Sequence, residues 1–147
     1  MATANTTKLE LLSPATLGEM NLENRMILAP LTRCRAVDNF VPQPMNTIYY
    51  AQRASAGLII SEATQVARNG LGYANTPGIY NQQQIEGWKE ITKAVHDKGG
   101  KIFLQLWQAG RVAHTDLLEA GDIPVAPSAI AADYLADLPN GQFPHVT

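Results

Sequence analysis

Apolar residues gather in three short runs along the chain, and polar residues follow each run. The runs are Met26–Ala29, Leu58–Ile60 and Ile102–Leu106, the last interrupted only by Gln105. Apolar runs of this length without alternation are typical of strands covered on both faces, as in a parallel sheet. The pattern therefore predicts buried strands at Arg25–Ala29, Leu58–Ile60 and Ile102–Leu106.

Between these strands the apolar residues change to helical spacing. A first helix is predicted from about Pro44 to Ala56, before Gly57, by the positions of Met45, Ile48, Tyr49 and Gln52. A second follows a capping-box pattern of Asn81 with Gln84 and ends at Gly99-Gly100, and its apolar stripe is Ile85, Trp88, Ile91 and Val95. Tyr49 and Trp88 are assigned to the core. The alternation of strands and helices predicts an α/β architecture with parallel strands.

The remaining segments are interpreted as tail, hairpins and loops. Residues 1–8 are small and polar, which predicts a disordered tail. Residues 9–22 predict a hairpin that closes the bottom of the sheet, and Pro139-Asn140-Gly141 predicts a second hairpin turn. Residues 63–80 predict a long loop, and loops of that length in a compact domain are usually functional.

Composition narrows the class of protein. The 147 residues are 46% hydrophobic and 16% charged with a net charge of -2, which is typical of one soluble globular domain. The arginines are scattered singly, so the sequence shows no footprint for nucleic acid. A polar start without a signal-peptide core makes the cytoplasm the expected compartment. The single cysteine, Cys34, excludes an internal disulfide.

Three groups of candidate functional residues follow the predicted strands. They are Pro30-Leu31-Thr32, the segment Glu62–Tyr73, and Gln105-Leu106-Trp107. The carboxyl ends of parallel strands meet at one edge of a sheet, where ligands of α/β folds bind. The groups are mostly neutral and aromatic, so general acid-base hydrolysis is poorly supported and a flat cofactor with polar edges fits better.

Each candidate also has a structural interpretation. Thr32 alone is best explained by a bond to the local backbone, whereas a long amide such as Gln105 in an apolar strand needs a partner, for which a ligand is one of few candidates. Trp107 is equally compatible with the core and with a pocket wall, and Tyr73 in a glycine-flanked loop favours function. Cys34, beside two arginines, has a minority interpretation as a reactive thiol.

Other motifs are absent. Gly70-Leu71-Gly72 begins like a dinucleotide-binding loop, but Asn75 stands where the last glycine belongs and no helix opens there. The three histidines lack metal-ligand spacing, and His96 and His145 are expected to be solvated.

Four motifs in order resemble the amino-terminal part of the Old Yellow Enzyme family, and Thr32 resembles its classical members. The motifs are residues 24–35, 57–63, 72–78 and 105–111. The resemblance implies an FMN-dependent ene-reductase on a (β/α)8 TIM barrel. Such an enzyme passes hydride from NADPH or NADH through the flavin to the activated C=C bond of α,β-unsaturated carbonyl compounds.

The resemblance also implies roles for individual residues. Pro30, Leu31 and Thr32 would border the flavin, and the Thr32 hydroxyl would bond the ring edge and tune its electron affinity. Ala63 would offer a backbone contact at the same edge, and Gln105 would bond the pyrimidine side. The substrate pocket would be shaped by Tyr73 and Trp107.

A complete barrel needs about 250 residues, and residues 9–147 would supply the hairpin and three of its eight strands. We therefore expect a complementary chain with the remaining strands, including the carbonyl-binding pair, the proton donor and the phosphate site. Alone, the open sheet is expected to be unstable. Two alternatives are a non-catalytic barrel fragment or interaction module that binds no flavin, and another flavin barrel with different substrates.

Overall fold

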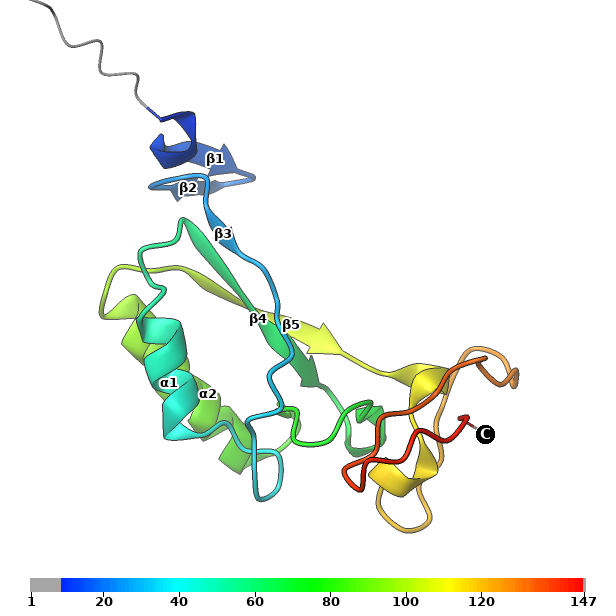
Figure 1. Ribbon diagram of the computed structural model, residues 1–147. Coiled ribbons are helices and arrows are strands. Elements are labelled where there is room, and N and C mark those ends of the chain that lie inside the picture. The colour runs from blue at the N-terminus through cyan, green and yellow to red at the C-terminus, as the bar shows by residue number, and fades with distance from the viewer. Residues whose placement is uncertain (1–8, 147) are drawn as a thin grey trace, which may run out of the picture.

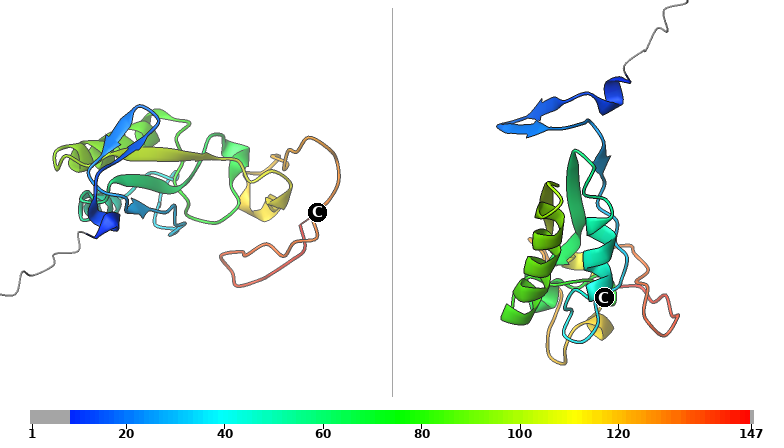
Figure 2. Two further views of the ribbon diagram at one scale, coloured as in Figure 1. Left: turned by 90° about the horizontal axis from the view of Figure 1, so that it is seen from above. Right: turned by 90° about the vertical axis from the view of Figure 1, so that its left-hand side faces the viewer.

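The computed structural model describes residues 9–146, and the tail predicted over 1–8 lies outside the described residues. Its centre is a parallel sheet in the order β3 (Ile27–Leu28), β4 (Leu58–Gln65), β5 (Ile102–Trp107). Helices α1 (Pro44–Ala51) and α2 (Gln82–His96) lie side by side against one face of the sheet (Figures 1 and 2). The predicted order of strands and helices is confirmed. The prediction of buried strands holds only for β4, because Ile27 on β3 is 47% exposed and Phe103 on β5 is 52% exposed.

The core lies between the two helices and this face of the sheet. Its buried members are Tyr50, Ala54, Ile59, Trp88, Ile91 and Val95. The Trp88 indole also donates to the carbonyl of Gly78 at 3.1 Å. Asn81 and Gln84 form the predicted capping box, in which each side chain accepts from the other residue's backbone N–H. The prediction for α2 is therefore confirmed in both its stripe and its cap.

The first helix differs from its prediction in length and in orientation. α1 ends at Ala51, and its buried residues are Asn46 and Tyr50. Met45 and Ile48, which suggested the helix, are 52% and 60% exposed. Tyr49 is half-buried and packs against the edge of this core, so its assignment to the core is confirmed only in part. The reason is that the inner face of α1 meets a buried carboxylate, Glu62, which requires polar partners.

Strand β4 is longer than predicted, and the loop expected from Ala63 begins after Gln65. Ile60 pairs with Phe103, and the next paired residues are Ala63 and Gln105. An advance of three residues along β4 therefore matches an advance of two residues along β5. This β-bulge of one extra residue brings Ala63 back to the face that Ile60 occupies. The polar residues of this stretch are therefore carried by a paired strand.

Both predicted hairpins are present. β1 (Ala15–Leu17) pairs antiparallel with β2 (Met20–Leu22), and near the other end Leu135 bridges antiparallel to His145 around the turn at Gly141. Short 3-10 helices complete the fold at Glu10–Leu12, Arg68–Gly70, Gly110–Val112 and Thr115–Leu117. Within residues 9–146, none of the helices has the length and apolar character that a membrane span requires.

Gly57 lies directly before β4 and packs against the chain that leads into β3, where there is no room for a side chain. Its N–H donates to the Asn24 side chain at 2.9 Å, and a Cβ at this position would lie 2.0 Å from the Asn24 carbonyl oxygen. We expect Gly57→Ala to lower the free energy of unfolding of the complete protein by about 3 kcal/mol, measured by urea denaturation. The exposed neighbour Ser55 is the control, and Ser55→Ala should change it by less than about 0.5 kcal/mol. Equal values for the two variants would contradict the assigned contact.

Candidate functional site

The structure brings the predicted site residues together at the carboxyl edge of the parallel sheet. Pro30-Leu31-Thr32 follows β3, and Ala63 on β4 pairs directly with Gln105 on β5. Because paired residues of neighbouring strands share a face, Ala63 and Gln105 lie on the face opposite the helices. Leu31 and Thr32 are exposed. The convergence that the sequence predicted is therefore present.

Gln105 is fixed through its backbone while its amide stays available. The N–H of Gln105 donates to the Ser61 hydroxyl at 3.0 Å, which replaces a regular ladder bond at the bulge. Ser61 in turn donates to the Glu62 carbonyl at 2.9 Å. The half-buried Gln105 side chain forms no hydrogen bond with the rest of residues 9–146, so its donors and acceptor can serve a ligand.

An aromatic wall stands beside this amide. The rings of Tyr73 and Trp107 are stacked, with centroids 5.8 Å apart and planes 15° apart. A Cβ on Gly72 would lie 2.7 Å from the Trp107 ring, so only glycine allows this approach. The Tyr73 hydroxyl lies 3.2 Å from that of Tyr134, on the second hairpin. Tyr134 was missed because 61 residues separate it from Tyr73 and no local pattern links them.

The contact between the Tyr73 and Tyr134 hydroxyls affects the acidity of Tyr134. Its pKa is raised, first by the hydrogen bond with Tyr73 and then by burial. A raised pKa keeps the phenol neutral, so the pair presents hydroxyl groups and no charge to the wall.

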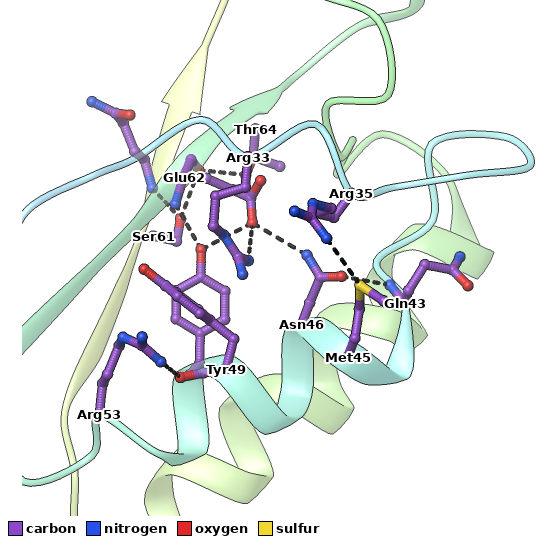
Figure 3. Close-up of polar contacts among 12 residues, drawn as sticks. Arg33, Arg35, Gln43, Met45, Asn46, Tyr49, Arg53, Ser61, Glu62 and Thr64 are labelled. Carbon is purple, nitrogen blue, oxygen red and sulfur yellow. Dashed lines mark hydrogen bonds and ion pairs between the residues drawn. The ribbon is translucent and has the colours of Figure 1, made fainter.

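Glu62 opens the candidate segment Glu62–Tyr73, but the sequence assigned it no role of its own. Its side chain is fully buried behind Ala63. Its Oε1 accepts hydrogen bonds from the guanidinium of Arg33 at 2.5 Å, from the Asn46 amide at 3.2 Å and from the Tyr50 hydroxyl at 3.1 Å. Figure 3 shows Arg33 and Asn46 reaching this oxygen from two different segments. Because three donors meet on one oxygen, the group acts as a carboxylate.

Aromatic rings enclose the same cluster. The guanidinium carbon of Arg33 lies 3.6 Å from the ring centroid of Tyr49, and Arg53 lies 3.7 Å from that ring. Tyr50 also accepts from the Glu62 N–H at 2.8 Å. Burial, followed by the charge of Glu62, raises the pKa of Tyr50. Arg33 Nε and Glu62 Oε2 are buried without a hydrogen-bond partner among the described residues.

Other titratable residues do not join the site. Cys34 is exposed, and its pKa is raised by partial burial and then by Glu62, which disfavours the thiolate and a reactive role. His96 and His145 are exposed as expected, whereas His114 is buried and accepts the Asp116 N–H at 3.1 Å. Residues 9–146 contain no group of three or more histidine, cysteine or carboxylate side chains placed to hold a metal.

The donor set suits one chemical class of ligand. The amide of Gln105 is free, the Thr32 hydroxyl is exposed, and both lie at the carboxyl edge of a sheet whose open face carries the exposed Phe103. A flat heteroaromatic ring with polar edges needs this combination, and the residues therefore fit FMN.

Comparisons with known proteins agree with this geometry. A parallel sheet with helices on one face and neutral hydrogen-bonding groups at its carboxyl edge is the arrangement of part of an α/β barrel. The model of the NADH:flavin oxidoreductase / NADH oxidase family matches residues 10–142. The chain belongs to this family, and it supplies the amino-terminal hairpin and first three strands of an Old Yellow Enzyme TIM barrel.

Among curated relatives, 12-oxophytodienoate reductase 1 of Oryza sativa subsp. japonica is 52% identical over 117 residues, covering 79% of this chain and 30% of the relative. A probable flavin mononucleotide-dependent alkene reductase of Leishmania infantum is 46% identical over 121 residues, covering 82% and 33%. The chain thus spans 30% to 33% of the length of these two relatives.

Solved structures likewise match most of this chain but less than half of their own length. Morphinone reductase in complex with tetrahydroNAD has a TM-score of 0.85 at 46% identity, and the match covers 95% of this chain and 40% of that chain. The Old Yellow Enzyme homologue from Zymomonas mobilis has a TM-score of 0.85 at 47% identity, covering 93% and 38%. The roles predicted for individual residues stay predictions.

Tyr50→Phe tests the buried cluster. Loss of the hydroxyl leaves the buried Glu62 N–H without an acceptor, which should cost about 1–3 kcal/mol at neutral pH. Because burial raises the pKa of Tyr50 above its ordinary value of 10.0, its stabilising contribution is complete below that pH and is lost as pH rises further. Urea denaturation at increasing pH should therefore show a shallower alkaline loss for the variant.

Tyr80→Phe is the control for removal of a hydroxyl, since that hydroxyl forms no hydrogen bond in the described structure. It should leave the free energy of unfolding at neutral pH unchanged within about 0.5 kcal/mol. An alkaline loss in Tyr50→Phe as steep as in the wild type would contradict the assignment.

Proposed function

We propose that this chain forms the flavin-binding first part of an FMN-dependent ene-reductase, which reduces the activated C=C bond of α,β-unsaturated carbonyl compounds with NADPH or NADH. The observation that carries the proposal is the free amide of Gln105, which is paired with Ala63 at the carboxyl edge of a sheet of this family. When bound, FMN would accept hydride from the nicotinamide and deliver it to the substrate carbon. The cytoplasm remains the proposed compartment.

The chain's own residues bind and orient in this proposal. Pro30 and Leu31 provide an apolar border for the ring, and Thr32 provides a hydroxyl whose hydrogen bond tunes the affinity of the ring for electrons. Ala63 presents its backbone, and its small side chain leaves the face open. The Gln105 amide can both donate and accept, as a pyrimidine edge requires.

The aromatic wall has a separate role. Tyr73 and Trp107 bound the space beside Gln105, and their stacked rings exclude water from one side of it. The bond between Tyr73 and Tyr134 ties this wall to the second hairpin. We assign the three residues to the substrate pocket.

The open edges and face of the sheet are proposed to receive the remaining barrel strands, from the same polypeptide or from a complementary chain. Phe103, on the face opposite the helices, is 52% exposed, and Leu106, on the outer strand, is 64% exposed. Exposed apolar residues on strand edges favour pairing with further strands. The carbonyl-binding pair, the proton donor and the phosphate site would come from that part.

The direct test is an anaerobic assay of the complete FMN-loaded protein, with the remaining barrel strands present, using NADPH or NADH and a simple cyclic enone. We expect the nicotinamide to be oxidised in step with loss of the enone C=C bond, followed by absorbance and by product analysis. A flavin-loaded protein that oxidises nicotinamide without consuming any activated alkene would support another flavin barrel. A folded protein that binds no flavin would support the interaction module.

Gln105→Leu tests the predicted cofactor contact. Loss of a neutral hydrogen bond of about 0.5–1.5 kcal/mol should raise the Kd for FMN by about 2- to 13-fold, measured by quenching of flavin fluorescence. Gln83→Leu, on the exposed side of α2, is the matched control and should leave the Kd unchanged. Equal affinity and an unchanged flavin spectrum in both variants would mean that Gln105 is only structural.

A further inference from the structure

Two proposed flavin contacts each stand next in sequence to one member of the buried ion pair. Thr32 precedes Arg33, and Ala63 follows Glu62. Thr32 is exposed and Ala63 lies on the face opposite the helices, whereas Arg33 and Glu62 meet on the helix side at 2.5 Å. The ion pair therefore connects, from behind, the two segments that carry these contacts.

The segment that carries Thr32 has few other anchors. Strand β3 ends at Leu28, and no backbone hydrogen bond links residues 31–35 to the rest of the described chain until the Ala36 N–H donates to the Asn75 carbonyl at 2.9 Å. Cys34 then adopts a left-handed backbone with φ of 52°, which turns the chain directly after Arg33. The Arg33 side chain is thus the polar anchor nearest to Thr32.

This anchor is rigid because of its surroundings. The Arg33 side chain is 17% exposed and stacks on the Tyr49 ring, and the Glu62 carboxylate is held by Asn46 and Tyr50 from α1. A planar guanidinium held by stacking and by a charged hydrogen bond has little rotational freedom. The bulge at Ser61–Glu62 places the carboxylate behind the sheet and Ala63 in front of it.

We infer that Arg33 and Glu62 form a positioning pair that sets the place of the Thr32 hydroxyl relative to Ala63, and through Thr32 sets the electron affinity of the bound flavin. The inference rests on the proposed function, because it needs FMN at this edge. Arg33 and Glu62 themselves lie behind the site and act only through their neighbours.

The test uses the complete FMN-loaded protein and the double variant Arg33→Met with Glu62→Gln. Removing both charges together avoids an uncompensated buried ion, and a glutamine at 62 can still accept from Asn46 and Tyr50. Two quantities are measured, the Kd for FMN and the flavin midpoint potential. Replacing residues that orient metal ligands weakens metal binding by about 10- to 100-fold. By analogy, we expect the double variant to raise the Kd for FMN by an amount at the lower end of that range.

Thr32→Ala, alone and combined with the double variant, shows whether the pair acts through Thr32. A hydroxyl that donates to the reduced ring stabilises it, so both Thr32→Ala and the double variant should lower the midpoint potential. In the Thr32→Ala background the double variant should hardly change the midpoint potential further, because the pair acts only through the Thr32 hydroxyl, which is already removed. Arg33→Lys keeps the charge but loses the planar stack, and should fall between the wild type and the double variant.

Ile91→Val is the control, because it weakens the same core without touching the pair. It should leave the potential unchanged. Shifts of Thr32→Ala and the double variant that simply add, or a double variant with the wild-type potential, would overturn the inference while leaving the proposed function intact. A wild-type protein that binds no FMN would overturn the proposed function itself.

Discussion

The carboxylate of Glu62, buried behind the sheet, is the constraint on which the arrangement of this molecule depends. A buried charge is stable only with charged and hydrogen-bonding partners. Those partners are three residues from two segments: Arg33 after β3, and Asn46 and Tyr50 on α1. The need to supply them fixes α1 against β4, makes the inner face of that helix polar, and holds the chain that leaves β3 close to the neighbouring strand.

The bulge in β4 connects this buried cluster to the open face. Without the extra residue, strict alternation would point Glu62 away from the helices and Ala63 toward them. With it, Ala63 stands beside Gln105 and the Ser61 hydroxyl takes over the backbone bond of Gln105. One irregularity in pairing therefore gives the sheet a charged side toward the helices and a neutral side opposite them. Bulges beside functional sites often redirect side chains in this way.

Local patterns in the sequence predict the parts of the fold that local forces decide. The apolar runs predict all three parallel strands, and the Asn81–Gln84 box with the Trp88 stripe predicts α2, because burial and capping act within a few residues. The orientation of α1 is not predictable in this way, since it depends on Glu62, and neither is Tyr134, which meets Tyr73 only in the folded chain. The parallel-strand rule predicts where the site residues converge, but their roles come from family resemblance.

We propose that the face opposite the helices binds a flavin through Thr32, Ala63 and Gln105. Size-exclusion chromatography of the complete protein with excess FMN, followed by absorbance in the flavin band, tests it most directly. Flavin absorbance should elute with the folded protein after free FMN has been separated. A folded protein that elutes without flavin, under conditions where a known flavoprotein of the same family retains it, would contradict the account.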